Sequence, residues 1–362
     1  MAKKKTIRKG LCIFLSLCLF LVGGAGGAFL AIDGARTPSG AIPSNGNLSI
    51  HFLELGNAYT GDCTYIKAGD TDILIDAGSK YSSIPTIAAY LDEHVSDGVL
   101  EYVIVTHAHE DHYAGFATPE GTDSIFDLYE CEVIIDFAKT NKADTAQMQS
   151  YYLRERADEI ANGATHYTAA DCIEQNKNIF DLGDGMQLEI LDSYYYYNKA
   201  STENDYSVCM MLHEGDNRYL FTGDLEEKGE EYLVSYNDLP EVKLYKAGHH
   251  GSKTSSTEAL LSVIRPEIVC VCCCAGSAEY TTAKENQFPT QEFIDRVAPY
   301  TAQIYVTTLC IDWSKKTYTS MNGNIVVTST GTEVTVICSA SPLLLKQSEW
   351  FSENRTWPVG GK

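Results

Sequence analysis

Residues 102–112 read Tyr-Val-Ile-Val-Thr-His-Ala-His-Glu-Asp-His. The apolar residues that open this stretch predict a buried strand, and the polar residues that follow predict the turn at its end. Because extended side chains alternate in direction, His107 and His109 should point the same way, whereas Asp111 and His112 fall on a second centre nearby. Imidazole and carboxylate are ligands that divalent zinc, manganese and iron prefer. We therefore predict a site for two divalent metal ions, zinc or manganese, which is a hydrolytic arrangement.

The spacing of histidines along the chain supports the metal interpretation. The chain has 9 histidines in 362 residues, and three of them lie within positions 107–112. An isolated histidine is more often a surface or core residue than a ligand, but such a concentration after a strand favours a metal site. Asp76, Asp224 and the pair His249-His250 also follow apolar stretches. If those strands share a sheet edge, these side chains should converge on one cleft.

The order of these motifs resembles that of the metallo-β-lactamase superfamily, in particular the extracellular hydrolase domain of ComEC-type competence proteins and their stand-alone relatives. The most specific elements are the His-x-His-x-Asp-His motif and Gly-His-His-Gly-Ser at residues 248–252. Further matching stretches are residues 51–56, 61–63, 73–78, 204–207 and 220–224. The resemblance covers roughly residues 48–340, and it implies an α/β fold with a four-layer αβ/βα sandwich of the metallo-β-lactamase type.

The resemblance also implies a set of candidate metal ligands: His107, His109, Asp111, His112, Asp224, His249 and His250. In this set His107 and His109 hold one metal ion, Asp111 and His112 hold the second, and Asp224 bridges the two. Either His249 or His250 completes a coordination shell, and the spacing does not decide which of the two does so. Asp111 and Asp224 are the predicted catalytic residues, since Asp111 could also accept the proton of the attacking nucleophile.

Four further residues are predicted to orient the ligands or to contact the substrate: Asp76, Asn204, Ser207 and Ser252. Asp76 would hold a ligand imidazole through its free N–H group, or alternatively cap the turn at Gly78. Backbone N–H groups at Gly251 and Ser252 would approach an anionic oxygen.

Two features depart from the pattern of the family. Many superfamily members place another metal-binding histidine between the His-x-His-x-Asp-His motif and the turn that corresponds to Gly223-Asp224. Between these two elements this chain has only His166 and His213. ComEC-type proteins often carry a Tyr-x-His-Pro element, and the corresponding stretch here is Asn286-Gln287-Phe288-Pro289, with Phe288 in the place of the histidine. The second departure bears more on nuclease activity than on metal binding.

The N-terminal residues form a separate segment. Five basic residues precede the largely apolar stretch 11–32, a pattern typical of export signals and long enough to span a bilayer. We expect residues 1–32 to be a signal anchor, forming one apolar helix, or a cleaved signal peptide; in both cases the hydrolase lies outside the cytoplasm. Residues 33–47 are expected to be a flexible linker, residues 48–340 the hydrolase domain, and residues 341–362 a C-terminal tail.

The pattern of short β-branched runs and helical stretches predicts two β-rich halves flanked by helices. Strands are predicted at residues 49–55, 63–68, 72–76, 101–106, 131–136, 187–192, 206–212, 217–222, 241–246, 267–273 and 302–307, with a hairpin at 324–328 and 333–337. Helices are predicted at residues 82–95, 142–162, 225–235, 255–263 and 290–298.

The charge of the chain bears on its partners. The formal net charge is −22, and residues 1–33 contain five basic residues and one acidic residue. Residues 34–362 therefore carry 22 basic and 48 acidic residues, a net charge of −26. Because nucleic-acid binders usually show the opposite balance, this charge lowers the expectation that long DNA is the substrate.

These observations favour a membrane-anchored, extracytoplasmic, metal-dependent hydrolase of phosphodiesters, with DNA as the substrate class that the resemblance implies and no protein partner implied. The first alternative is a hydrolase of small or cell-wall phosphodiesters, including phosphorylcholine esters, which the acidity and the tyrosine run 194–197 would suit. The second alternative is a non-catalytic scaffold that retains a metal site.

Overall fold

The computed structural model describes residues 47–362. The predicted N-terminal apolar helix and residues 33–46 of the predicted linker lie outside the described residues. Within the described part of the chain, no helix is long and apolar enough to cross a membrane.

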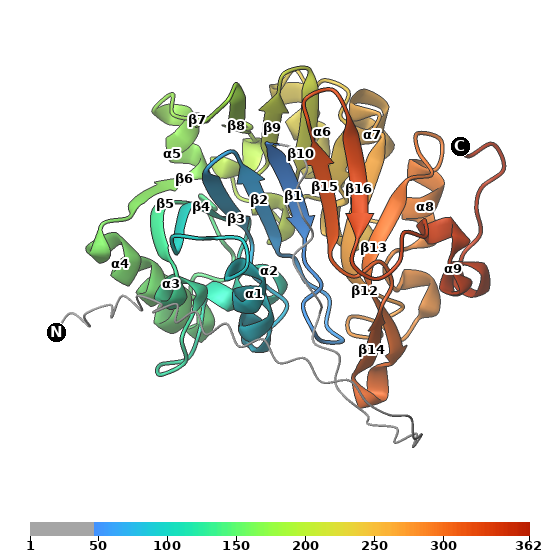
Figure 1. Ribbon diagram of the computed structural model, residues 1–362, viewed down its shortest axis with the longest axis horizontal. Helices are drawn as coiled ribbons and strands as arrows, with labels where there is room; N and C mark the ends of the chain where they lie inside the picture. The colour runs from blue at the N-terminus through green and yellow to red at the C-terminus, as the bar shows by residue number, and fades with distance from the viewer. Residues whose placement is uncertain (1–46) are drawn as a thin grey trace, which may run out of the picture. The chain divides into compact units, whose positions relative to one another are not determined.

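Sixteen strands form two eight-stranded sheets in the described residues (Figure 1). The first sheet has the order β16 (Val334–Cys338), β15 (Ile325–Ser329), β1 (Leu48–Phe52), β2 (Thr64–Ala68), β3 (Thr71–Ile75), β4 (Val99–Val105), β5 (Glu130–Asp136) and β6 (Thr165–Thr168). The second has the order β14 (Thr317–Ser320), β13 (Ile304–Asp312), β12 (Ile268–Ala275), β11 (Leu244–Lys246), β10 (Asn217–Phe221), β9 (Met210–Glu214), β8 (Met186–Ile190) and β7 (Ile179–Gly183). Both sheets are mixed, since β3 to β6 and β10 to β13 pair in parallel whereas the remaining neighbours are antiparallel.

The two sheets pack face to face, as the central strand β12 illustrates. All eight residues of β12 are buried. Its side chains alternate between two cores: Cys270 and Cys272 belong to the core between the sheets, whereas Val269 and Val271 belong to a second core on the outer face. A strand buried on both faces needs apolar residues at every position, which explains its run of valines and cysteines. The cysteines of this run serve as small buried hydrophobes.

Helices cover the outer face of each sheet. Next to the first sheet lie α1 (Ile84–Leu91), α2 (Glu110–Tyr113), α3 (Ile125–Leu128) and α4 (Leu153–Asn162), and α5 (Ala169–Glu174) follows β6 (Figure 1). The outer core of the second sheet includes residues of α6 (Glu227–Tyr236), α7 (Glu258–Ile264) and α8 (Gln291–Val297). The order helix, sheet, sheet, helix confirms the predicted α/β fold with a four-layer αβ/βα sandwich.

Several predicted elements differ from those of the structure. The helix predicted at 142–162 is a π-helical turn at Gln147–Tyr152 followed by α4, and the strand predicted at 206–212 begins only at Met210. The late start of β9 has a local cause, because Asn204–Tyr206 form a 3-10 turn. The helix predicted at 82–95 ends at Leu91. Seven helices and strands were not predicted: β6, β7, β14, α2, α3, α5 and the helix α9 (Glu349–Asn354).

Residues 341–362, assigned as a tail from the sequence, pack on the domain. Leu345 and Phe351 are buried in the outer core of the second sheet. Arg355 donates hydrogen bonds to the carbonyl oxygens of Pro289 at 2.8 Å and Gln287 at 2.6 Å. The C-terminal segment therefore braces the loop that precedes α8.

The buried histidine of β1 predicts a dependence of stability on pH. His51 is 1% exposed, and its ring lies 2.7 Å from both the Tyr90 hydroxyl and the Ser49 hydroxyl. Burial, with a smaller contribution from His94, lowers the pKa of His51 to about 3. The folded protein therefore keeps His51 neutral while the unfolded chain takes up a proton below pH 6.5. We expect this group to cost about 1.5 kcal/mol of unfolding free energy between pH 6.5 and pH 5.

Urea unfolding at both pH values measures this effect, with His51→Gln as the variant that cannot titrate. The variant should lose less stability than the wild type over this interval. Equal losses in the two proteins would show that His51 is not kept neutral by its surroundings.

Candidate metal centre

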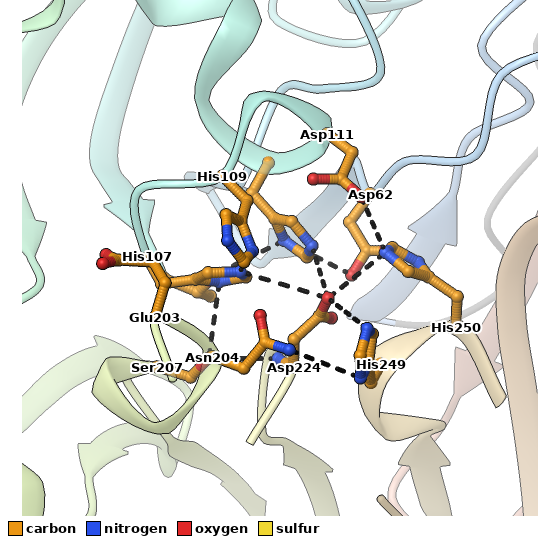
Figure 2. A network of polar contacts seen from close by, with 12 residues as sticks. Asp62, His107, His109, Asp111, Glu203, Asn204, Ser207, Asp224, His249 and His250 are labelled. Carbon is orange, nitrogen blue, oxygen red and sulfur yellow. Dashed lines mark hydrogen bonds and ion pairs between the residues drawn. The ribbon is translucent and has the colours of Figure 1, made fainter. Parts of the chain in front are cut away.

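The candidate ligands converge because their strands are neighbours. Asp76 follows β3 and His107 follows β4, and these two strands pair in parallel in the first sheet. Asp224 follows β10 and the pair His249-His250 follows β11, which pair in parallel in the second sheet. The carboxyl ends of all four strands meet at one edge of the sandwich, so the predicted convergence on one site is what the structure shows (Figure 2).

One oxygen atom lies at the middle of this group. Nε2 atoms of four histidines lie within 4.0 Å of Asp224 Oδ2: His112 at 3.1 Å, His250 at 3.3 Å, His249 at 3.9 Å and His107 at 4.0 Å. Asp224 is 1% exposed. An arrangement in which four imidazole nitrogens face one buried carboxylate oxygen is suited to ligands that share metal ions.

The ligands form two groups around Asp224. On one side His107 Nε2 lies 3.0 Å from His109 Nδ1. On the other side His250 Nε2 lies 3.3 Å from Asp111 Oδ2, close to His112. The predicted ligands of one ion, His107 and His109, thus lie together, and so do the predicted ligands of the other, Asp111 and His112. It also associates His250, rather than His249, with the position of Asp111 and His112.

The Nδ1 atoms of three imidazoles contact polar groups on the side of each ring away from Asp224. Asp76 Oδ2 lies 2.8 Å from His112 Nδ1, and Asp76 also accepts hydrogen bonds from the backbone N–H and hydroxyl of Thr106. His250 Nδ1 lies 2.9 Å from the Cys272 carbonyl oxygen, and His107 Nδ1 lies 3.1 Å from the Thr106 hydroxyl. Such contacts fix the ring orientation and leave Nε2 facing the centre. Asp76 therefore lies where a residue that orients the His112 ring would have to lie.

Asp62 is a member of the centre for which no role was predicted from the sequence. It is 1% exposed, forms an ion pair with Lys246, and lies 3.2 Å from His250 Nδ1 and 3.7 Å from His112 Nδ1. Asp62, His112, Asp224 and His250 place ligand atoms within 4.8 Å of one another. Because Asp62 faces the Nδ1 side of both rings and is neutralised by Lys246, we assign it to holding the imidazoles. The only signal for Asp62 in the sequence was that it belongs to the stretch Gly61-Asp62-Cys63, which matches the family.

His249 has its own supporting contacts. Its Nδ1 atom lies 2.9 Å from the Thr254 hydroxyl, 3.5 Å from Glu226 Oε1 and 3.4 Å from Asn204 Nδ2. These contacts turn Nε2 toward Asp224. Both histidines of the pair therefore face the centre, with left-handed backbone angles of φ 46° at His249 and 55° at His250. Strained backbone of this kind is often found at functional sites.

The remaining predicted residues lie at different distances from the centre. The Ser207 hydroxyl accepts a hydrogen bond from the Asp224 backbone N–H at 3.0 Å and lies 3.4 Å from His107 Nδ1. Asn204 donates to Glu226 Oε1 at 3.1 Å, while its own side-chain oxygen is buried without a partner in the described structure. The Ser252 hydroxyl lies 3.1 Å from that of Thr254, so it supports the residue that holds His249.

Two histidines considered as additional ligands lie elsewhere. His166 Nε2 is 2.8 Å from Asp136 Oδ1, and His213 Nε2 is 2.9 Å from Glu189 Oε2. Neither has a contact with the ligand group. Each is explained by its own carboxylate partner.

The electrostatics of the centre favour cations. Burial opposes ionisation of Asp224, but His112, His250 and His249 outweigh burial and hold its pKa well below the usual value. Burial would lower the pKa of His250, yet Asp224 and Asp62 reverse this effect and raise it well above the usual value. The carboxylates therefore need positive charge beside them. Protons on the imidazoles can supply it, and metal ions would displace those protons on binding.

The donor atoms fit divalent metal ions. His112 Nε2, His250 Nε2 and Asp224 Oδ1 are buried without a hydrogen-bond partner among residues 47–362, and the two nitrogens face the other oxygen of Asp224. Buried polar atoms without partners are rare unless a ligand or water satisfies them. Imidazole and carboxylate donors suit zinc, manganese and iron alike. The residues therefore form a plausible divalent metal site.

Comparison with known proteins agrees with this geometry. Residues 56–118 and 200–275 match the family model described as the metallo-beta-lactamase superfamily. The match supports a metallo-beta-lactamase domain in this chain. The matched segments contain most of the centre, including the His-x-His-x-Asp-His motif, Asp224 and both histidines after β11.

The curated relatives of this chain are competence and recombination proteins. It is 30% identical over 120 residues to Recombination protein 2 of Haemophilus influenzae, covering 33% of this chain and 14% of that protein. It is 27% identical over 173 residues to ComE operon protein 3 of Bacillus subtilis, covering 46% of this chain and 19% of that protein. The match thus spans less than a fifth of the length of either relative.

Solved structures of low sequence identity also align with this one. The metallo-beta-lactamase fold protein YhfI from Bacillus subtilis aligns with a TM-score of 0.43 and 11% identity, covering 73% of this chain and 96% of that one. The diiron β-hydroxylase CmlA from Streptomyces venezuelae aligns with a TM-score of 0.36 and 10% identity, covering 64% and 45%.

Replacing a histidine of the centre should remove bound metal. We expect His250→Gln to bind less zinc or manganese than the wild type, because Nε2 of His250 faces both Asp111 and Asp224. His213→Gln is the matched control, since His213 pairs with Glu189 outside the centre. Elemental analysis after dialysis measures the metal content. Equal metal content in His250→Gln and the control would contradict the assignment.

The carboxylate behind His112 should tune affinity without being a ligand. Asp76 has a φ of 58°, a conformation that asparagine also tolerates, so Asp76→Asn should keep the fold. Loss of its charge should weaken metal binding by about 10- to 100-fold, as is usual for residues that orient ligands. Competition with a chromogenic chelator measures the dissociation constant. An unchanged constant would show that Asp76 only stabilises the turn.

Proposed function

We propose that this chain is a metal-dependent hydrolase of phosphodiesters that uses two divalent metal ions, zinc or manganese. The observation that carries the proposal is the arrangement of four histidine Nε2 atoms around Asp224 Oδ2, with Asp111 beside His250. The match to the metallo-beta-lactamase superfamily model supports hydrolysis as the class of reaction.

The charge of the centre supports two ions rather than one. Five carboxylates lie at the centre, and they come from Asp62, Asp76, Asp111, Asp224 and Glu226. Among the described residues, Lys246 pairs with one of them, Asp62. With neutral imidazoles this group carries a net charge of −4. One divalent ion would leave it negative and repel an anionic ester, whereas two would neutralise it.

The residues divide the work as follows. His107 and His109 would hold one ion, Asp111, His112 and His250 the other, with Asp224 between them. Bound divalent ions lower the pKa of water and neutralise charge on the attacked and leaving oxygens. The protein itself supplies a rigid, buried set of donors, and Asp111 is kept ionised because His250 and His112 outweigh the effect of burial on its pKa. Asp111 can then accept a proton from the attacking water.

The substrate class is proposed from the relatives and from the charge. The names of the curated relatives refer to competence and recombination, processes that involve DNA, which supports a DNA phosphodiester. The net charge of −26 over residues 34–362 favours instead a small or cell-wall phosphodiester. The tyrosine run gives less support to a phosphorylcholine ester, because Tyr195 and Tyr196 are buried and Tyr194 stacks on Tyr232.

We place the reaction outside the cytoplasm. The basic residues before the apolar stretch 11–32 support export, with the chain anchored in the membrane or released by cleavage. We propose that this segment binds the membrane. We propose no protein partner.

Hydrolysis of bis(p-nitrophenyl) phosphate in the presence of zinc or manganese tests the proposed activity. We expect turnover by the wild type and a loss of at least about 100-fold in Asp111→Ala, in keeping with removal of a general base. Activity on single-stranded DNA and on phosphorylcholine esters would then choose between the two substrate classes. Bound metal with no turnover of any phosphodiester would contradict the proposal and favour a metal-binding scaffold.

A further inference from the structure

A small pocket opens beside the metal centre. It is a shallow hollow lined by residues that include Thr60, Ser277, Tyr280, Gln287 and Phe288. These come from the loop before β2 and from the loop between β12 and α8. The lining combines two aromatic rings with hydroxyl and amide groups, which suits an ester that carries a ring and polar atoms.

Phe288 connects the pocket to the candidate ligands. Its ring centroid lies 5.7 Å from that of His249 and 5.8 Å from that of His250. It also lies 5.6 Å from the ring of Tyr280. The pocket and the metal centre are therefore separated by one aromatic side chain, so a molecule in the pocket lies next to the ligands.

Tyr280 reaches from the pocket into the centre. Its hydroxyl donates a hydrogen bond to Asp111 Oδ2, the oxygen that also lies 3.3 Å from His250 Nε2. The residue is nevertheless 55% exposed. A ring that is open to solvent and a hydroxyl that donates to the partly buried carboxylate of Asp111 place Tyr280 at the mouth of the site. Among the pocket-lining residues of the described chain, it is the one whose polar group hydrogen-bonds to a candidate ligand.

The other polar groups nearby are engaged elsewhere. Glu279 accepts a hydrogen bond from the Thr60 backbone N–H at 2.8 Å, and Asn286 accepts one from Lys253 at 2.7 Å. Lys80 pairs with Glu110. A phenol has a single proton to donate, and at neutral pH it keeps that proton. Tyr280 is thus the donor best placed to meet an anionic oxygen that enters between the pocket and Asp111.

We propose that Tyr280 is a further catalytic residue, whose hydroxyl donates a hydrogen bond to a non-bridging oxygen of the phosphodiester, while Phe288 holds the Tyr280 ring in place. This inference rests on the proposed phosphodiesterase function. The hydroxyl turns from Asp111 to the substrate when the ester is bound, so the donor is in position before the reaction begins. Donors positioned in this way typically contribute about 10²- to 10³-fold to the rate.

The test compares Tyr280→Phe with the wild type on methyl p-nitrophenyl phosphate and on the two stereoisomers of its phosphorothioate. Tyr280→Phe should lower kcat/KM for the phosphate by about 100-fold with metal content unchanged. Sulfur accepts hydrogen bonds poorly, so for one stereoisomer the two proteins should differ by less than about 10-fold. Tyr81→Phe is the matched control, since Tyr81 is an exposed tyrosine outside the pocket lining.

Several results would overturn the inference. Full activity of Tyr280→Phe would show that the hydroxyl is not used. Loss of bound metal in the variant would show that Tyr280 only positions Asp111. An equal loss on the phosphate and on both stereoisomers would show that it does not touch a non-bridging oxygen. If the wild type hydrolysed no phosphodiester, that result would contradict the proposed function, and this inference would fail with it.

Discussion

The carboxylate of Asp224, with its buried oxygen facing four imidazole nitrogens, is the constraint on which the rest of the structure depends. Ionised groups are costly to bury unless opposite charge and hydrogen bonds surround them. The fold meets this need by bringing the ends of β3, β4, β10 and β11 to one edge of the two sheets. Each turn at that edge then contributes a ligand or a group that holds one.

The close approach of backbone segments at this edge explains two of the glycines. An added Cβ at Gly78 would lie 2.1 Å from the backbone of Asp111, so only glycine allows the β3 turn to pass behind the His-x-His-x-Asp-His motif. Gly223, with φ 53°, packs against Ser207 and Thr106 in the same way. The positions of the ligands are therefore set by backbone packing as much as by their own contacts.

The sequence was most informative where ligands are close together in the chain. The motif 107–112 and the pair His249-His250 were recognised from local spacing, and the sandwich followed from the resemblance that they carried. Asp62 could not be assigned, because its role depends on Lys246 and on two imidazoles that come from both sheets. Tyr280 could not be assigned either, since nothing in its local sequence indicates that its hydroxyl meets Asp111.

Edge elements were also missed, for a physical reason. The strands β6, β7 and β14 lie at or near the sheet edges and are half exposed, so their apolar alternation is weak. The helix α9 has six residues and is placed by packing of Phe351 rather than by its own periodicity. The central strands are buried on both faces, so their continuous apolar runs can be recognised in the sequence.

The central claim is that Asp224 lies between two metal ions. Anomalous diffraction from crystals grown with manganese or zinc measures this most directly, because it locates each ion without reference to activity. We expect two anomalous peaks, one beside His107 and His109 and one beside Asp111, His112 and His250, with Asp224 contacting both. A single peak held by Asp62, His112 and His250, or no peak at these residues, would contradict it.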